Sequence, residues 1–163
     1  MTPSFLLRIA PVITVLYCAG HTMGMPWTPA TGPQEAAVLD AMKTARFATM
    51  GTVRTYLDFY FGFGAAISGY LALQAIVLWQ LASLAKSVAN QVRPLIAALF
   101  ASFVVNAILV WKYFFAVPLV FAIAIAICLA AAFISARPGK TGIETRYNFI
   151  SWPPARWARR HVL

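Results

Sequence analysis

Acidic residues are scarce in this chain. Four Asp and Glu occur among 163 residues, and charged residues of both signs make up only 10%. Soluble domains are about a quarter charged and about half apolar, whereas 61% of this chain is hydrophobic and its mean hydropathy is +0.76. Since a domain of this length exposes much of its surface, the composition excludes an ordinary water-soluble domain and indicates a membrane protein.

Cysteine is also rare. Cys18 and Cys128 both lie in apolar runs and form no C-x-x-C pair, which argues against a disulfide framework and a dithiol redox motif. No phosphate-binding loop is present, so the sequence does not indicate a nucleotide-driven pump. Thirteen Lys and Arg give a net charge of +9. No nucleic-acid-binding motif accompanies them, so we expect no nucleic-acid partner.

Four long apolar runs are the main positive feature of the sequence. About 20 apolar residues cross a bilayer as a helix, and helices are required because lipid offers no partner to free backbone groups. We therefore predict an all-α polytopic membrane protein, with a four-transmembrane-helix bundle formed by residues 1–136. The expected spans are about 4–22, 54–84, 94–114 and 116–136.

Two segments lie outside the predicted spans. Between spans one and two, residues 34–50 place Val38, Leu39 and Met42 among charged residues, which predicts a short amphipathic helix at the membrane surface. After span four, residues 137–163 form a basic tail. We expect this tail to lie at the interface along anionic lipid headgroups.

Basic residues are distributed unevenly between the two sides of the predicted bundle. With both termini on one side, that side carries more Lys and Arg than the other, and the positive-inside rule then predicts cytoplasmic termini. We expect a multi-pass protein of the bacterial inner membrane. The terminal side holds Arg8, Lys86, Arg93, Arg137, Lys140, Arg146, Arg156, Arg159 and Arg160, and the opposite side holds Lys43, Arg46, Arg54 and Lys112.

This topology brings ionisable side chains from three spans to the outer face. His21 ends span one, Arg54 and Asp58 begin span two, and Lys112 ends span three. Charges near hydrocarbon usually face a cavity or one another, and Arg54 and Asp58 are spaced to pair on one helix face. Together with Tyr60 they predict an outer-leaflet pocket for a lipid or a small apolar molecule. In the structural alternative, the pair locks the helix start and Lys112 snorkels to the interface.

Small residues recur in span two. Gly62, Gly64, Ser68 and Gly69 are predicted to be helix-packing positions, because small side chains let helices approach closely in a bilayer. Such a face would also suit a second copy of the chain or a partner in a larger membrane complex. Gln74 and Asn106, near the middles of spans two and three, could each hydrogen-bond across helices.

Potential metal ligands lie near the end of span one. Cys18, His21, Met23 and Met25 supply thiol, imidazole and thioether groups, the set that favours Cu(I). Methionine also fills gaps in cores without binding anything. We expect no cofactor and no metal site, with copper at these four residues as the alternative.

Two stretches carry a resemblance to a known group of proteins. His21-Thr22-x-Gly24 and Asp58-Phe-Tyr-Phe-Gly-Phe-Gly64 are similar to a family of small, uncharacterised bacterial four-span membrane proteins. The resemblance covers spans one and two and their loop, and it implies the fold but no activity.

Three functions remain open on the sequence alone. The first is a non-enzymatic binding or accessory protein with the outer-leaflet pocket. The second is an intramembrane enzyme in which His21 acts as acid or base and Asp58 orients it. The third is a structural subunit of a larger membrane complex.

Overall fold

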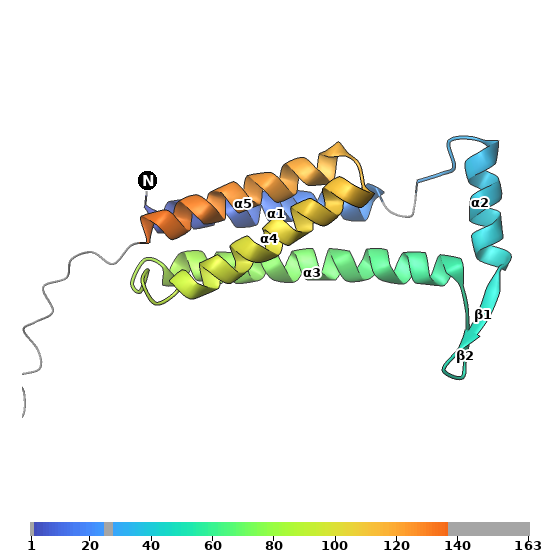
Figure 1. Ribbon diagram of the computed structural model, residues 1–163, viewed down its shortest axis with the longest axis horizontal. Helices are drawn as coiled ribbons and strands as arrows, with labels where there is room; N and C mark the ends of the chain where they lie inside the picture. The colour runs from blue at the N-terminus through green and yellow to red at the C-terminus, as the bar shows by residue number, and fades with distance from the viewer. Residues whose placement is uncertain (1, 25–27, 137–163) are drawn as a thin grey trace, which may run out of the picture.

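Four long apolar helices dominate the structure, as the sequence predicts (Figure 1). The computed structural model describes residues 2–24 and 28–136. The expected basic tail, residues 137–163, lies outside these ranges. In chain order the elements are α1 (Pro3–Gly24), α2 (Pro33–Thr44), β1 (Arg46–Thr49), β2 (Thr52–Thr55), α3 (Tyr56–Leu84), α4 (Arg93–Tyr113) and α5 (Ala116–Ser135).

The lengths of the four long helices suit a bilayer. They contain 22, 29, 21 and 20 residues, and at about 1.5 Å per residue each is about 30 Å or longer. The hydrocarbon core of a bilayer is about 30 Å thick. By length and composition, α1, α3, α4 and α5 could each cross a membrane.

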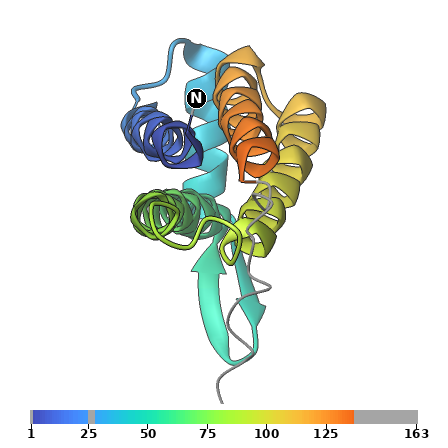
Figure 2. The same ribbon diagram turned by 90° about the vertical axis from the view of Figure 1, so that its left-hand side faces the viewer.

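The four helices pack around a compact apolar core. Helix α1 contacts both α3 and α5, and α5 also contacts α4, an arrangement visible end-on in Figure 2. Large side chains from all four helices fill the centre, and each is almost fully buried. They are Leu7, Leu78, Ile96, Phe103, Ile125 and Leu129.

The outward surface of the bundle is apolar as well. On α3, for example, Leu73 and Ile76 are each 55% exposed, and Ile127 on α5 is 62% exposed. A soluble monomer rarely shows a continuous apolar surface of this extent. The surface is suited to hydrocarbon, in which exposed apolar side chains carry no cost.

The bundle has two distinct ends. At the terminal end lie the start of α1, the α3–α4 connection and the end of α5 (Figure 1). At the hairpin end lie the end of α1, the α4–α5 turn and the start of α3, together with α2 and the two strands (Figure 1). Helix α3 extends past the end of α1 at the hairpin end.

The predicted helix over residues 34–50 was wrong beyond Thr44, where a β-hairpin begins, so the fold is not purely α-helical. Strands β1 and β2 pair antiparallel, with Arg46 opposite Thr55 and Thr49 opposite Thr52. Met50 and Gly51 connect them with φ angles of 48° and 79°. Two successive positive φ values are typical of the two-residue turn that matches the twist of a hairpin.

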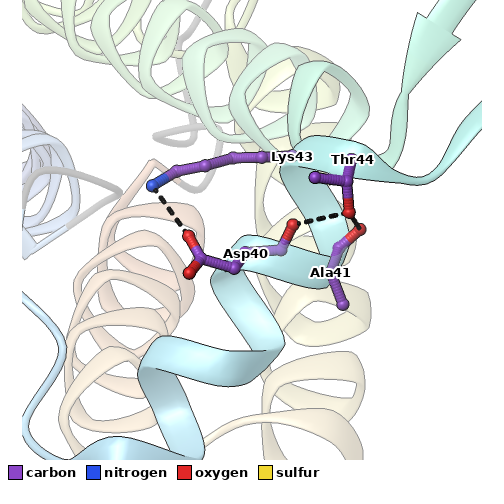
Figure 3. A network of polar contacts seen from close by, with 4 residues as sticks. All are labelled: Asp40, Ala41, Lys43 and Thr44. Carbon is purple, nitrogen blue, oxygen red and sulfur yellow. Dashed lines mark hydrogen bonds and ion pairs between the residues drawn. The ribbon is translucent and has the colours of Figure 1, made fainter.

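Helix α2 lies on the surface, and none of its residues is buried. Figure 3 shows its last turn, in which the Thr44 hydroxyl donates to the Asp40 carbonyl at 2.9 Å. Lys43 Nζ lies 3.4 Å from Asp40 Oδ1, and both side chains are more than half exposed. Exposed pairs of this kind contribute little stability.

The first turn of α2 is held by Glu35. Its carboxylate accepts hydrogen bonds from the backbone N–H of Thr31 at 2.7 Å and from the Thr31 hydroxyl at 2.6 Å. These hydrogen bonds lower the pKa of Glu35 below its usual value. A negative charge there also suits the positive end of the helix dipole.

Aromatic rings attach the hairpin to α3. The ring of Phe47 on β1 lies 5.0 Å from that of Tyr56 and 5.1 Å from that of Phe59, and Phe59 contacts Phe63 at 5.9 Å. These distances are typical of favourable aromatic pairs. The cluster lies in the first turns of α3, at the hairpin end of the bundle, a position that suits the aromatic belt of a membrane interface.

Candidate functional site

His21 contacts α3 within the bundle and not at the start of α3. Its Nε2 lies 3.1 Å from the Gly64 carbonyl oxygen, to which it donates. One turn earlier on α1, the Cys18 thiol donates to the Ser68 carbonyl at 3.3 Å. Thr22 Oγ1 lies 2.8 Å from Ser68 Oγ. These polar contacts join α1 to α3 near the hairpin end.

Asp58 has a different role. Its carboxylate accepts from the Thr55 backbone N–H at 2.8 Å, and the Thr55 hydroxyl accepts from the Asp58 N–H at 3.1 Å. This reciprocal pair is a capping box, which satisfies free donors at a helix start. Asp58 precedes Gly64 by six residues, so it lies about 9 Å farther along the α3 axis than the residue that His21 contacts.

The other predicted ligand-binding residues are also spread over the hairpin end. Arg54 is exposed on β2, and its Nη1 donates to the Val53 carbonyl at 3.2 Å. Tyr60 is 43% exposed. Lys112 Nζ lies 5.1 Å from the centre of the Tyr113 ring. The structure therefore brings these residues to one end of the bundle but not into one pocket.

No ion pair joins Arg54 to Asp58. In the described ranges, the one ion pair is that between Lys43 and Asp40. The three acidic residues there are all engaged, Glu35 with Thr31, Asp40 with Lys43 and Asp58 with Thr55. Lys112 therefore has no carboxylate partner within the part of the chain that the structure describes.

The four small residues of α3 face different surroundings. Gly64 is buried and Ser68 is half-buried, and both are contacted by α1 through the hydrogen bonds above. Gly62 and Gly69 are exposed, and a Cβ atom added at either would meet nothing within 4 Å. Helix packing within the chain thus uses the Gly64–Ser68 side of α3.

The potential copper ligands do not converge in the described residues. Cys18 and His21 each donate to a carbonyl of α3, and Met23 is 78% exposed. Met25 lies outside the described residues. Across residues 2–24 and 28–136, no group of three or more His, Cys, Asp and Glu is placed to hold a metal ion.

A second polar contact ties α1 to α4 and α5. The side chain of Asn106 on α4 is hydrogen-bonded to Tyr17 on α1. The Tyr17 ring also stacks on Phe121 of α5, with centres 5.4 Å apart and planes within 4°. A hydrogen bond inside an apolar bundle fixes the relative position of the helices that it joins.

A groove lies between α4 and α5, where no sequence pattern predicts one. Its volume is about 470 Å³, within the range of about 300–1,000 Å³ that is typical of small-molecule sites. Apolar side chains line it almost throughout. They are Phe100, Val104, Ala107, Ile108 and Trp111 on α4 and Leu119, Ile123, Ala126, Ile127 and Ala130 on α5.

Small and large residues together make this groove. Ala107, Ala126 and Ala130 leave space at its floor, whereas Phe100 and Trp111 lie near its two ends. The rim is open, since Ile123 is 44% exposed and Ile127 is 62% exposed. The groove therefore faces the surroundings of the bundle and not its core.

Comparison with known proteins adds no relative: no protein-family model, no curated protein and no solved structure matches this chain. The site is therefore argued from its own geometry. That geometry places an apolar groove on a bundle whose four long helices are suited to a membrane.

Proposed function

We propose that this chain is a non-enzymatic protein of the bacterial inner membrane, and that it binds a lipid chain or a small apolar molecule in the α4–α5 groove. The groove carries this proposal, because it is large enough for such a ligand and is lined by apolar side chains. Its open rim lies on the surface that would face the hydrocarbon. A ligand could therefore enter sideways from the bilayer.

The orientation follows from the charges. With the six basic residues that follow α5 in the sequence counted on the terminal side, that side carries more Lys and Arg than the hairpin end, which favours a cytoplasmic terminal end under the positive-inside rule. The hairpin end, with α2 and both strands, then lies on the outer side. The groove begins at Trp111 and Leu119, within about one turn of the hairpin end of α4 and α5, and extends past the middle of both helices. A ligand that enters at the hairpin end would come from the outer leaflet.

The enzymatic alternative has less support. Its two residues, His21 and Asp58, each have another partner, and they are offset by about 9 Å along α3. A general base and its orienting group need to lie within hydrogen-bonding reach or be bridged by one water. The proposal therefore includes no chemical step.

Photo-crosslinking tests the proposal. The purified protein is placed in phosphatidylcholine nanodiscs with a fatty acid that carries a diazirine at mid-chain, and crosslinked peptides are mapped by mass spectrometry. We expect crosslinks at residues 100–111 and 119–130 to exceed those on the exposed face of α3 at Leu73 and Ile76. The α3 face reports ordinary contact with the bilayer.

Filling the groove provides the matched comparison. In Ala107→Leu/Ala130→Leu, the added side chains occupy the floor of the groove, so the excess crosslinking should disappear. Ala101→Leu adds the same side chain at an exposed position of α4 that does not line the groove, and it should retain the excess. Equal crosslinking of the groove and the α3 face in the unsubstituted protein would overturn the proposal.

A further inference from the structure

The two ends of the groove differ in a way that identifies its ligand. Phe100 and Ala130 mark one end, past the middle of α4 and α5 toward the terminal side, and Trp111 and Leu119 mark the other, at the hairpin end. Eleven residues of α4 separate Phe100 from Trp111, which corresponds to about 16 Å along the helix. Half of a 30 Å hydrocarbon core is about 15 Å, so the groove has the length of one acyl chain in one leaflet.

A positive charge lies at the hairpin end of the groove. Lys112 follows the lining residue Ile108 by four positions, and residues four apart lie on the same side of a helix. Its side chain is exposed and rests on the Tyr113 ring. The three acids of the described ranges are all paired elsewhere, so the Lys112 ammonium is available to an anion from outside the chain.

Trp111 also indicates that the hairpin end of the groove lies at the level of the lipid headgroups. It lines the groove and is 75% exposed. Tryptophan favours the level of the headgroups, where its ring is in contact with both apolar and polar surroundings. An ammonium one residue farther along would then lie among phosphates, to which it can donate three hydrogen bonds.

We propose that the α4–α5 groove holds an acyl chain of an outer-leaflet phospholipid with an anionic headgroup, and that Lys112 binds this headgroup. This inference rests on the proposed function and adds the class and the orientation of the ligand. The apolar groove accounts for the acyl chain, and the ammonium of Lys112, which has no carboxylate partner in residues 2–24 and 28–136, accounts for the charge. A neutral apolar molecule would use the groove but not Lys112.

The test compares two phospholipid probes. Phosphatidylglycerol and phosphatidylcholine, each with the same diazirine-labelled chain, are added at equal mole fraction to phosphatidylcholine nanodiscs that contain the full chain. Crosslinks in residues 100–130 are quantified against those at Leu73 and Ile76 on α3. One Lys near a membrane surface attracts an anionic lipid about fivefold, so we expect about five times more groove crosslinking by phosphatidylglycerol.

Three variants assign this preference to Lys112. Lys112→Gln should reduce the ratio of phosphatidylglycerol to phosphatidylcholine crosslinks in the groove to about one, and Lys112→Arg should preserve the preference because it keeps the charge. Arg54→Gln removes one positive charge at the same end, away from the groove, and should leave the ratio unchanged. Salt at high concentration should lower the ratio in the unsubstituted protein, since screening weakens exposed charges.

The outcomes separate the two proposals. If both probes crosslink the groove above the α3 face but equally, the headgroup inference fails and the proposed function stands. The inference also fails if Lys112→Gln keeps the preference. If neither probe exceeds the α3 face, the groove is empty of lipid or covered by a second copy of the chain, and both proposals fail.

Discussion

Removal of one aromatic ring should release the β-hairpin from α3. Phe47 makes two of the ring contacts in the cluster, to Tyr56 at 5.0 Å and to Phe59 at 5.1 Å. Each aromatic pair contributes about 0.5–1.5 kcal/mol beyond the area that it buries. Because Phe47 is only half-buried, we take the lower part of the combined range, about 1–2 kcal/mol, as the effect of Phe47→Ala. A loss of this size raises the open population about 5–30-fold.

Limited tryptic digestion measures this opening. Trypsin cleaves after Arg46 and Arg54, which lie on the two strands, and the cleavage rate follows the open population when closing is fast. We expect cleavage at these two sites to accelerate about 5–30-fold in Phe47→Ala, with no change at Lys86 near the other end of the bundle. Thermal unfolding of the bundle should be unchanged, since Phe47 lies outside its core.

Val53→Ala is the control for this experiment. Val53 lies on the partner strand opposite Ala48, is 56% exposed and makes no ring contact. If Phe47→Ala and Val53→Ala are cleaved at the same rate, the aromatic cluster does not hold the hairpin and the reasoning is wrong.

Three other predictions concern the helices. A double-mutant cycle of Tyr17→Phe and Asn106→Ala, measured by denaturation in mixed micelles, should give a coupling of about 0.6–1.7 kcal/mol, as for hydrogen bonds between membrane helices; additive effects would contradict this. Gly64→Leu should destabilise the bundle by about 1–3 kcal/mol through overpacking, whereas Gly69→Leu at an open position should change the same unfolding curve little. The lowered pKa of Glu35 predicts that its contribution is complete above the unfolded pKa of about 4.3 and is lost as the pH falls through the lower folded value. Hydrogen exchange at the start of α2 should therefore accelerate below about pH 4 relative to the start of α4, whose first turn contains no acidic residue.

The four long helices were predictable because hydrocarbon leaves the backbone few choices. A run such as Leu95 to Tyr113 must bond its own backbone groups within the helix, so its apolar length determines the structure. Proline also marked the boundaries, since Pro94 lies in the first turn of α4 and Pro118 in that of α5. Neither position requires a backbone N–H donor.

The hairpin was missed because its signal is short. The helical pattern of residues 34–44 predicts a helix that continues to residue 50, whereas the chain turns at Met50-Gly51 and continues with the β-branched residues Thr52 and Val53. Met50 occupies a positive φ of 48°, which is uncommon for a residue other than glycine. A sequence pattern based on common turn residues gives no reason to expect a turn there.

The candidate site was predictable in part. The charged residues predicted for the site do lie at one end of the bundle, as the lengths of the helices require. However, α3 is long enough that Asp58 lies farther along its axis than the residue that His21 contacts. The groove could not be read from the sequence, since Ala107 and Ala126 resemble any other small residues in apolar helices. Whether such residues leave a hollow depends on how α4 packs against α5. The sequence of a single chain does not specify the packing geometry of two helices.

Polar contacts and the groove have separate roles in this fold. His21 and Tyr17 fix α1 against its neighbours, whereas the lining of the groove is apolar, so changes in the two regions should affect different properties. Asn106→Ala should lower stability and keep the preference for the anionic probe. Ala107→Leu/Ala130→Leu should abolish groove crosslinking and keep stability, because added methyl groups fill a hollow that is already open. If Asn106→Ala instead removed crosslinking at unchanged stability, the groove and the polar contacts would form one site and this division would be wrong.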